Sequence, residues 1–144
     1  EIKKHGLHTT CIDPDQQAID HAINFVKVDR GHVGSLENFE PETNFDLICF
    51  NKVLEHVKSP IMNVKEAVKY LADDGIMYLE MPEGESIFNE QIIDQRAEFA
   101  VEHYTVYNTS SMQRIAELSD LELLKLESII DPSGKRTIYG FYAK

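Results

Sequence analysis

Short apolar runs and longer amphipathic segments follow one another along the chain. Apolar or alternating runs predict strands at residues 8–13, 25–33, 45–50 and 76–81. Helices are predicted at residues 14–22, 59–75, 86–99 and 110–118, and the polar residues 37–44 predict a loop. The run at residues 45–50 (FDLICF) is nearly unbroken, which is typical of a strand buried on both faces, as in a parallel sheet.

The helix after this run has the clearest boundaries. Ser59 suits the cap, Pro60 suits the first helical position, and Gly75 is a stop signal. Apolar residues follow the start at spacings of three, four and three, which places them on one helix face. They are Ile61, Val64, Val68 and Leu71.

A hairpin is predicted at the carboxyl end. Apolar runs at residues 121–130 and 137–143 flank residues 131–134 (DPSG), which have the composition of a turn. Together with the alternation of strands and helices before it, this predicts an α/β class with a mostly parallel, doubly wound sheet. The final strand is expected to run antiparallel to the others.

Composition narrows the class of function. The 144 residues suit one domain, residues 1–144, and the net charge is −11 from 14 basic and 25 acidic residues. Such a charge argues against nucleic acid as a partner, and no apolar run is long enough to span a bilayer. Cys11 and Cys49 stand in apolar runs, so we expect reduced core cysteines and a cytoplasmic protein.

Asp13 is the first candidate for chemistry. It ends a predicted strand, and Pro14 with Asp15 then opens a helix. Ligands of doubly wound sheets bind beyond the carboxyl ends of the strands, where a carboxylate can accept the hydroxyl protons of a ribose. Asp before Pro is also favoured as a helix N-cap, so both interpretations stay open.

The second candidate is residues 51–57 (NKVLEHV), which follow the buried strand at the next loop on the ligand side. Its histidine, His56, is either a site residue or a capping or solvated residue. Glu55 beside it could suggest a metal, but no second ligand stands at helical spacing, so no metal is expected.

Residues 45–57 with Pro60, and then residues 71–82 (LADDGIMYLEMP), resemble the fourth- and fifth-strand segments of class I S-adenosylmethionine-dependent methyltransferases. Their order and spacing extend the resemblance over nearly the whole chain. It implies a Rossmann-like fold with S-adenosylmethionine as cofactor. By this resemblance Asp13 holds the ribose and Pro14 borders the adenine. The other residues implied at the cofactor are Ser35 and Leu36, which follow Gly34 near the adenine edge, and Asn51 and His56 near the methionine.

Residues 102–107 (EHYTVY) resemble a bacterial subgroup that includes sugar and natural-product methyltransferases. The resemblance implies that Glu102 and His103 face a small-molecule or carbohydrate-like acceptor. A histidine near neutral pKa suits the base that a hydroxyl or carbon acceptor needs. His103 as a structural hydrogen-bonding residue is the alternative.

The glycine-rich loop of the family precedes the ribose acid by about 20 residues. Only twelve residues precede Asp13, and no Gly-x-Gly occurs, so we expect the loop and the first strand to lie before Glu1. Without that loop, residues 1–144 alone are expected to be inactive. In the family's order that strand runs between the strands of Cys11 and Cys49, so no disulfide between them is expected. Without that strand, the strands of Cys11 and Cys49 would each lack a neighbour. Upstream residues or a second chain are favoured to fill this gap over direct pairing of the two strands, and a homodimer stays open.

Two other functions stay open. A methyltransferase-like module without activity would suit a basic partner protein, given the acidic charge. A nicotinamide-dependent oxidoreductase shares the sheet topology and the ribose acid, but residues 54–56 and 75–82 resemble methyltransferases instead.

Overall fold

The computed structural model describes residues 5–84, 103–132 and 134–144. The chain divides into two compact units, Glu1–Glu42 and Thr43–Lys144, and each is described by itself. In the first unit, strand β1 (Thr10–Asp13) pairs in parallel with β2 (Arg30–Val33). Helix α1 (Gln16–His21) and the π-helical turn η2 (Ala22–Val26) connect them. A Cβ on Gly31 would lie 2.6 Å from Ile19 Cγ2, so only a glycine lets α1 pack this closely on β2.

The start of α1 differs from the prediction. The helix begins at Gln16, and Asp15 is its N-cap, because the Asp15 side chain accepts a hydrogen bond from Gln17 N at 2.8 Å. Asp13 accepts from Asp15 N at 2.8 Å and so stabilises the turn before the helix. The capping role considered for Asp13 therefore belongs to Asp15.

The strand predicted at residues 25–33 is too long. Phe25 ends up in η2, 77% exposed and stacked on His21, and only residues 30–33 form a strand. Lys27 ends the helical turn with a φ of +66° and donates its backbone N–H to Ala22 O. The error arose because the apolar residues of η2 resemble the start of a strand in the sequence, whereas the chain continues as a helical turn through Val26.

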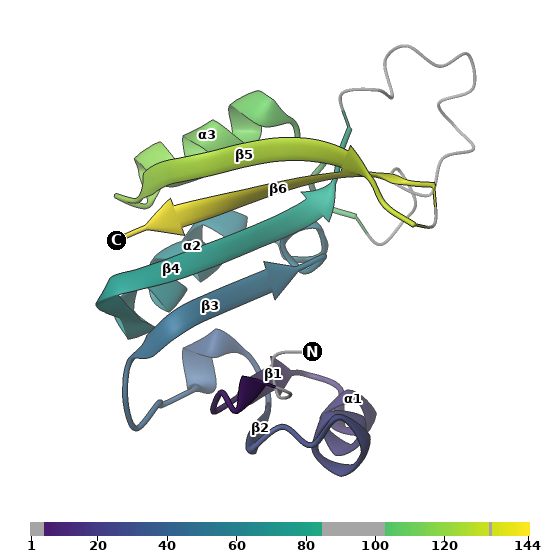
Figure 1. Cartoon of the computed structure of the whole chain (residues 1–144), viewed down its shortest axis with the longest axis vertical. Helices are drawn as coiled ribbons and strands as arrows, with labels where there is room; N and C mark the ends of the chain where they lie inside the picture. The colour runs from purple at the N-terminus through teal and green to yellow at the C-terminus, as the bar shows by residue number, and fades with distance from the viewer. Residues whose placement is uncertain (1–4, 85–102, 133) are drawn as a thin grey trace. The chain divides into compact units, whose positions relative to one another are not determined.

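The second unit contains a four-stranded sheet in the order β3-β4-β6-β5 (Figure 1). Strand β3 (Phe45–Asn51) pairs in parallel with β4 (Leu71–Pro82). Strand β6 (Arg136–Ala143) pairs antiparallel with β4 on one side and with β5 (Glu122–Ile130) on the other. The predicted hairpin and the reversed final strand are confirmed.

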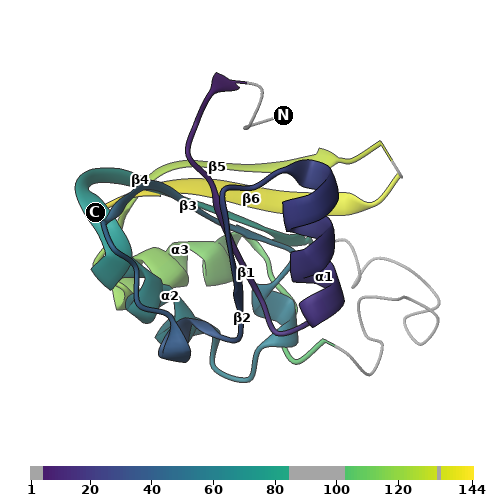
Figure 2. The ribbon, with the colours of Figure 1, turned by 90° about the horizontal axis from the view of Figure 1, so that it is seen from below.

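Helices α2 (Pro60–Tyr70) and α3 (Thr109–Leu118) lie on the same face of this sheet (Figure 2). Helix α2 begins with Pro60 as predicted but ends at Tyr70, before Gly75. Asn108 and Ser111 form a capping box at the start of α3. The core lies between helices and sheet, and its fully buried members include Val64, Ala67, Met77, Leu79, Met81, Met112, Ile138 and Tyr142.

The expectation that residues 45–50 are buried on both faces is wrong. Strand β3 is an edge strand of its sheet, and Leu47 and Cys49 on one face are exposed while Phe50 on the other is buried. Among the described residues of the second unit, Phe50 packs into the core while the side chains on the other face of β3 stay accessible. Cys11 is also only half-buried, so neither cysteine belongs to the core, and both are free thiols.

The α/β class is confirmed, with parallel pairing in both units and an antiparallel hairpin at the carboxyl end. The predicted loop at residues 37–44 begins with one 3₁₀ turn, η3 (Leu36–Asn38). The helix predicted at residues 86–99 and the turn residue Ser133 lie outside the described residues. Among the residues that the structure describes, no helix has the length and apolar character needed to cross a membrane.

Leu79→Ala should lower the free energy of unfolding by about 2–5 kcal/mol, because Leu79 is fully buried on central strand β4 and its truncation leaves a cavity. The matched control is Met62→Ala on α2, where the side chain is 64% exposed and the change should stay within about 0.5 kcal/mol. Urea unfolding of both variants measures this, and equal losses would contradict the assigned core.

Candidate functional site

Asp13 lies at the carboxyl end of β1, beside the loop that leaves β2. Gly34 N donates to Asp13 O at 3.0 Å, which joins the two loops at one edge of the small sheet. The Asp13 side chain is partly exposed, and Oδ1 accepts from Asp15 N. Among the described residues, no hydrogen bond to Oδ2 occurs, so this oxygen can accept from a hydroxyl group.

The other predicted cofactor residues of the first unit stand on the same two loops. Pro14 directly follows β1 and is exposed, and Ser35 is exposed at the start of η3. Leu36 is half-buried in η3. The structure therefore brings all four residues from the ends of β1 and β2 to a single edge, as expected for strands in parallel.

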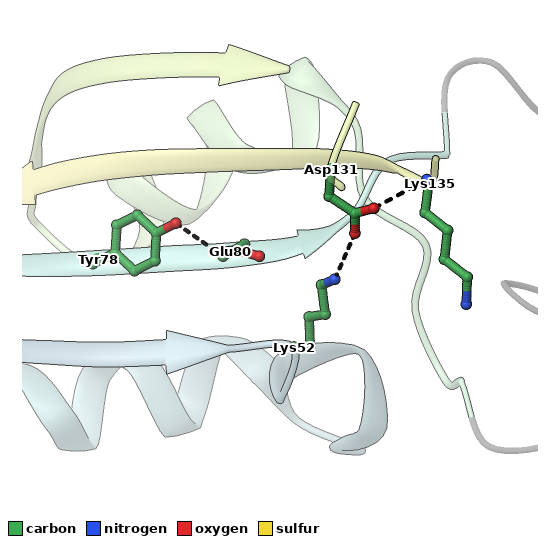
Figure 3. Close-up of polar contacts among 5 residues, drawn as sticks. All are labelled: Lys52, Tyr78, Glu80, Asp131 and Lys135. Carbon is green, nitrogen blue, oxygen red and sulfur yellow. Dashed lines mark hydrogen bonds and ion pairs between the residues drawn. The ribbon is translucent and has the colours of Figure 1, made fainter. Parts of the chain in front are cut away.

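Lys52 directly follows β3, at the carboxyl ends of the parallel strands β3 and β4. Its φ of +53° is unusual for a residue with a side chain, and its backbone N–H donates to Glu80 O at 2.7 Å. Its Nζ lies 3.2 Å from Asp131 Oδ2 at the end of the β5–β6 hairpin (Figure 3). Asp131 also accepts from Lys135 N at 3.1 Å. This ion pair ties the loop after β3 to the hairpin.

Asn51 is the exposed last residue of β3 and pairs in register with Glu80. Two residues before Glu80 on the same strand face, Tyr78 donates its hydroxyl to Glu80 Oε2 at 2.5 Å (Figure 3). Burial, and then this hydrogen bond to a carboxylate, raise the pKa of Tyr78 above its usual range. The face that carries Asn51 is therefore polar and acidic near the strand ends.

Three titratable side chains meet beyond the ends of β3 and β4: Glu55, His56 and His103, called here the Glu55–His56–His103 cluster. Glu55 and His56 stand on the 3₁₀ turn η4 (Leu54–His56), and His103 comes from 47 residues further along the chain. Glu55 Oε1 lies 3.9 Å from His56 Nε2, and the two imidazole ring centroids are 4.7 Å apart. Glu55 is buried, His56 is exposed and His103 is half-buried.

The segment after His103 is held against η4. Tyr104 N donates to Glu55 O at 2.8 Å, and the buried Tyr107 hydroxyl donates to Leu54 O at 3.1 Å. Gly84 N, just beyond β4, donates to Tyr107 O at 2.7 Å. These bonds fix where His103 enters the cluster, so its place depends on contacts distant in sequence.

Burial raises the pKa of Glu55, against the opposing effects of a backbone hydrogen bond and the nearby His56, His103 and Lys52. Burial also raises the pKa of Tyr107, and the charge of Glu55 adds to this shift. A buried carboxyl beside two imidazoles can hold a proton, form an ion pair with a histidine or bind a cation.

The structure thus joins two predicted site residues, His56 and His103, that the resemblance had assigned to different roles. Glu102 lies outside the described residues. Sequence reasoning considered Glu55 beside His56 as a metal pair but set it aside, because the further ligand, His103, does not stand at helical spacing. Sequence reasoning missed the Lys52–Asp131 pair, for which a separation of 79 residues leaves no local signal.

A family model described as a methyltransferase domain matches residues 1–126. The chain belongs to this methyltransferase family. A comparison with curated protein sequences gave no match.

Solved structures share the fold at low identity. The plantazolicin methyltransferase BpumL, in complex with a triazolic desmethylPZN analog and SAH, has a TM-score of 0.73 at 15% identity, covering 99% of this chain and 70% of that chain. The N-methyltransferase NodS from Bradyrhizobium japonicum WM9, in complex with S-adenosyl-l-homocysteine, has a TM-score of 0.68 at 17% identity, covering 94% of this chain and 65% of that chain. The 1,6-didemethyltoxoflavin-N1-methyltransferase from Burkholderia thailandensis has a TM-score of 0.65 at 11% identity, covering 99% of this chain and 74% of that chain. The fold is that of S-adenosylmethionine-dependent methyltransferases, and the chain spans 65–74% of the length of these three.

Tyr107→Phe should lower the free energy of unfolding by about 1 kcal/mol, because the buried hydroxyl loses its hydrogen bond to Leu54 O. This difference in stability between the wild type and Tyr107→Phe should have its full size below pH 10 and become smaller above it. Since the folded protein raises the pKa of Tyr107 above its ordinary 10.0, ionisation in the unfolded state offsets this stabilisation as the pH rises.

The control for this comparison is Tyr104→Phe, since Tyr104 is 61% exposed and its hydroxyl should contribute almost nothing. Urea unfolding between pH 7 and pH 11 measures both variants. A Tyr107→Phe protein as stable as the wild type at pH 7 would show that this bond does not hold η4.

Proposed function

We propose that the protein transfers a methyl group from S-adenosylmethionine to a small-molecule or carbohydrate-like acceptor. The observation that carries the proposal is the position of the predicted site residues. In each unit they lie at the carboxyl ends of parallel strands, where ligands of such sheets bind. Membership of the methyltransferase family supports the reaction class.

The cofactor would supply an electrophilic methyl group on a sulfonium. Asp13 suits the ribose, because its Oδ1 is occupied by Asp15 N while Oδ2 can accept from the two ribose hydroxyls. Pro14, Ser35 and Leu36 offer exposed and half-buried surface for the adenine on the adjoining loops. Asn51, exposed at the end of β3, can hydrogen-bond to the methionine part.

The acceptor would lie against the loops beyond β3 and β4, with Glu102 and His103 facing it. His103 can take the proton that a hydroxyl or amine acceptor releases as it attacks the methyl carbon, and it also orients the acceptor in line. Glu55 is buried beside the two imidazoles with its pKa raised by burial, so it can share a proton with this base. The structural neighbours include enzymes of plantazolicin and didemethyltoxoflavin, which supports a small-molecule acceptor.

Asp13→Asn should weaken binding of S-adenosylmethionine about 10- to 150-fold, because a charge-assisted hydrogen bond contributes about 1.5–3 kcal/mol. The matched control is Asp15→Asn, which removes the same charge two residues away while asparagine still caps α1. Calorimetry on a chain extended upstream by about 40 residues, the length of one strand-loop-helix unit, measures both. Equal affinities in the two variants would remove Asp13 from the ribose site.

His103→Ala should lower turnover by about 10²- to 10⁴-fold and leave the affinity for S-adenosylmethionine unchanged, because the imidazole serves the acceptor. Transfer of a labelled methyl group to a panel of hydroxyl and amine compounds, sugars included, identifies the acceptor for this assay. His21→Ala, on α1 in the other unit, is the control. Loss of cofactor binding in His103→Ala would assign this residue to the cofactor instead.

If the chain extended upstream folds but binds neither S-adenosylmethionine nor its demethylated product, the proposed function is overturned. The acidic charge of −11 would then favour the alternative, a methyltransferase-like module that binds a basic partner protein.

A further inference from the structure

The geometry points to a site for one divalent transition-metal ion, zinc foremost, held by Glu55, His56 and His103. Each residue offers one ligand atom, and the three atoms all lie within 4.8 Å of one another. This inference goes beyond methyl transfer and does not depend on it. It also departs from the expectation that no metal binds, which rested on ligand spacing along a single helix.

The donor set suits zinc in particular. Two imidazole nitrogens and one carboxylate oxygen are a ligand combination found in catalytic zinc sites, where a fourth position stays open. With metal–ligand distances of 2.0–2.2 Å, tetrahedral ligand atoms lie about 3.3–3.6 Å apart. The separation of 3.9 Å between Glu55 Oε1 and His56 Nε2 needs only a small closure to reach this spacing. His56 is 42% exposed, so its side chain has room to turn toward this spacing.

Glu55 gives an independent reason for a cation. The side chain is 2% exposed, and within the described part of the chain its buried oxygen Oε2 has no hydrogen-bond partner. A buried carboxylate oxygen left in this state is costly, and a cation that binds both oxygens of the Glu55 carboxylate would remove the cost. Lys52 does not fill this role, because its Nζ pairs with Asp131.

The supporting structure is already in place without an ion. Tyr104 N holds Glu55 O, and Tyr107 holds Leu54 O, so the backbone on both sides of the site is fixed. Ligands held by a rigid frame bind a metal more tightly than ligands that must first be ordered. The exposed side of His56 leaves the fourth position open to water or to an oxygen or nitrogen atom of a small molecule.

Metal binding changes what His103 can do. A lone pair given to a metal cannot accept a proton, so His103 is a ligand while the ion is bound and a proton acceptor only without it. A metal-bound hydroxyl or water loses its proton more readily, which is one way in which the ion can assist an acceptor.

The test is titration of metal-free protein with zinc chloride in a calorimeter, without S-adenosylmethionine or any acceptor. We expect one equivalent of zinc to bind. Glu55→Gln, His56→Ala and His103→Ala should each weaken zinc binding at least about 100-fold, which is more than the loss of a residue that only supports a metal ligand usually costs. His21→Ala, a histidine outside the cluster, should bind as the wild type does. Binding of cobalt(II) should give the absorption spectrum of a tetrahedral site, and this spectrum should be lost in the same three variants.

Circular dichroism shows whether each variant is folded. If Glu55→Gln does not fold, the two histidine variants and the cobalt spectrum of the wild type decide the question. The inference is overturned if folded wild type binds no zinc, if the histidine variants bind as tightly as the wild type, or if His21→Ala loses the binding. Failure of methyl transfer with zinc binding intact would overturn the proposed function alone.

Discussion

Parallel pairing of β3 with β4 is the constraint on which the candidate site depends. Parallel strands end at the same edge, so the loops that leave Asn51 and Pro82 must start side by side. The bond from Lys52 N to Glu80 O continues this pairing one residue beyond β3. The sharp, positive φ at Lys52 then turns the chain into η4, where Glu55 and His56 stand. A different register would move this turn and separate its residues from the segment that follows β4.

Tyr107 adds the second constraint. Its ring is buried, its hydroxyl binds the backbone of η4, and its carbonyl accepts from Gly84 beyond β4. One residue thus links the loops beyond two strands, through its hydroxyl and its backbone carbonyl, and it places His103, four residues earlier, beside His56. The burial that makes Tyr107 an anchor also isolates Glu55 from water, which raises the pKa of its carboxyl group. Packing and electrostatics at the cluster therefore have the same cause.

Local patterns predicted the elements whose signals are local. Pro60 begins α2, the DPSG segment lies between the hairpin strands, and the apolar run at residues 45–50 is a strand. Errors arose where a neighbour decides the outcome. The sequence pattern predicted a strand at Phe25, but the helical turn η2 follows α1 and contains this residue. The pattern also predicted that Leu47 and Cys49 are buried, but β3 is an edge strand of its sheet and both side chains are exposed. The sequence offered Asp13 as the cap and placed Asp15 inside the first turn, and only the hydrogen bond from Gln17 N to Asp15 identifies Asp15 as the N-cap.

By itself the sequence determined the class of fold, the methyltransferase resemblance, and the position of Asp13, Asn51 and His56 at or just beyond strand ends. Those features depend on composition and on the order of residues near one another, which a chain carries without its fold. Tertiary structure alone decided that His103 joins Glu55 and His56, and that Lys52 pairs with Asp131. Such contacts join residues 47 and 79 positions apart, and strand order and burial, rather than any local pattern, bring them within bonding distance.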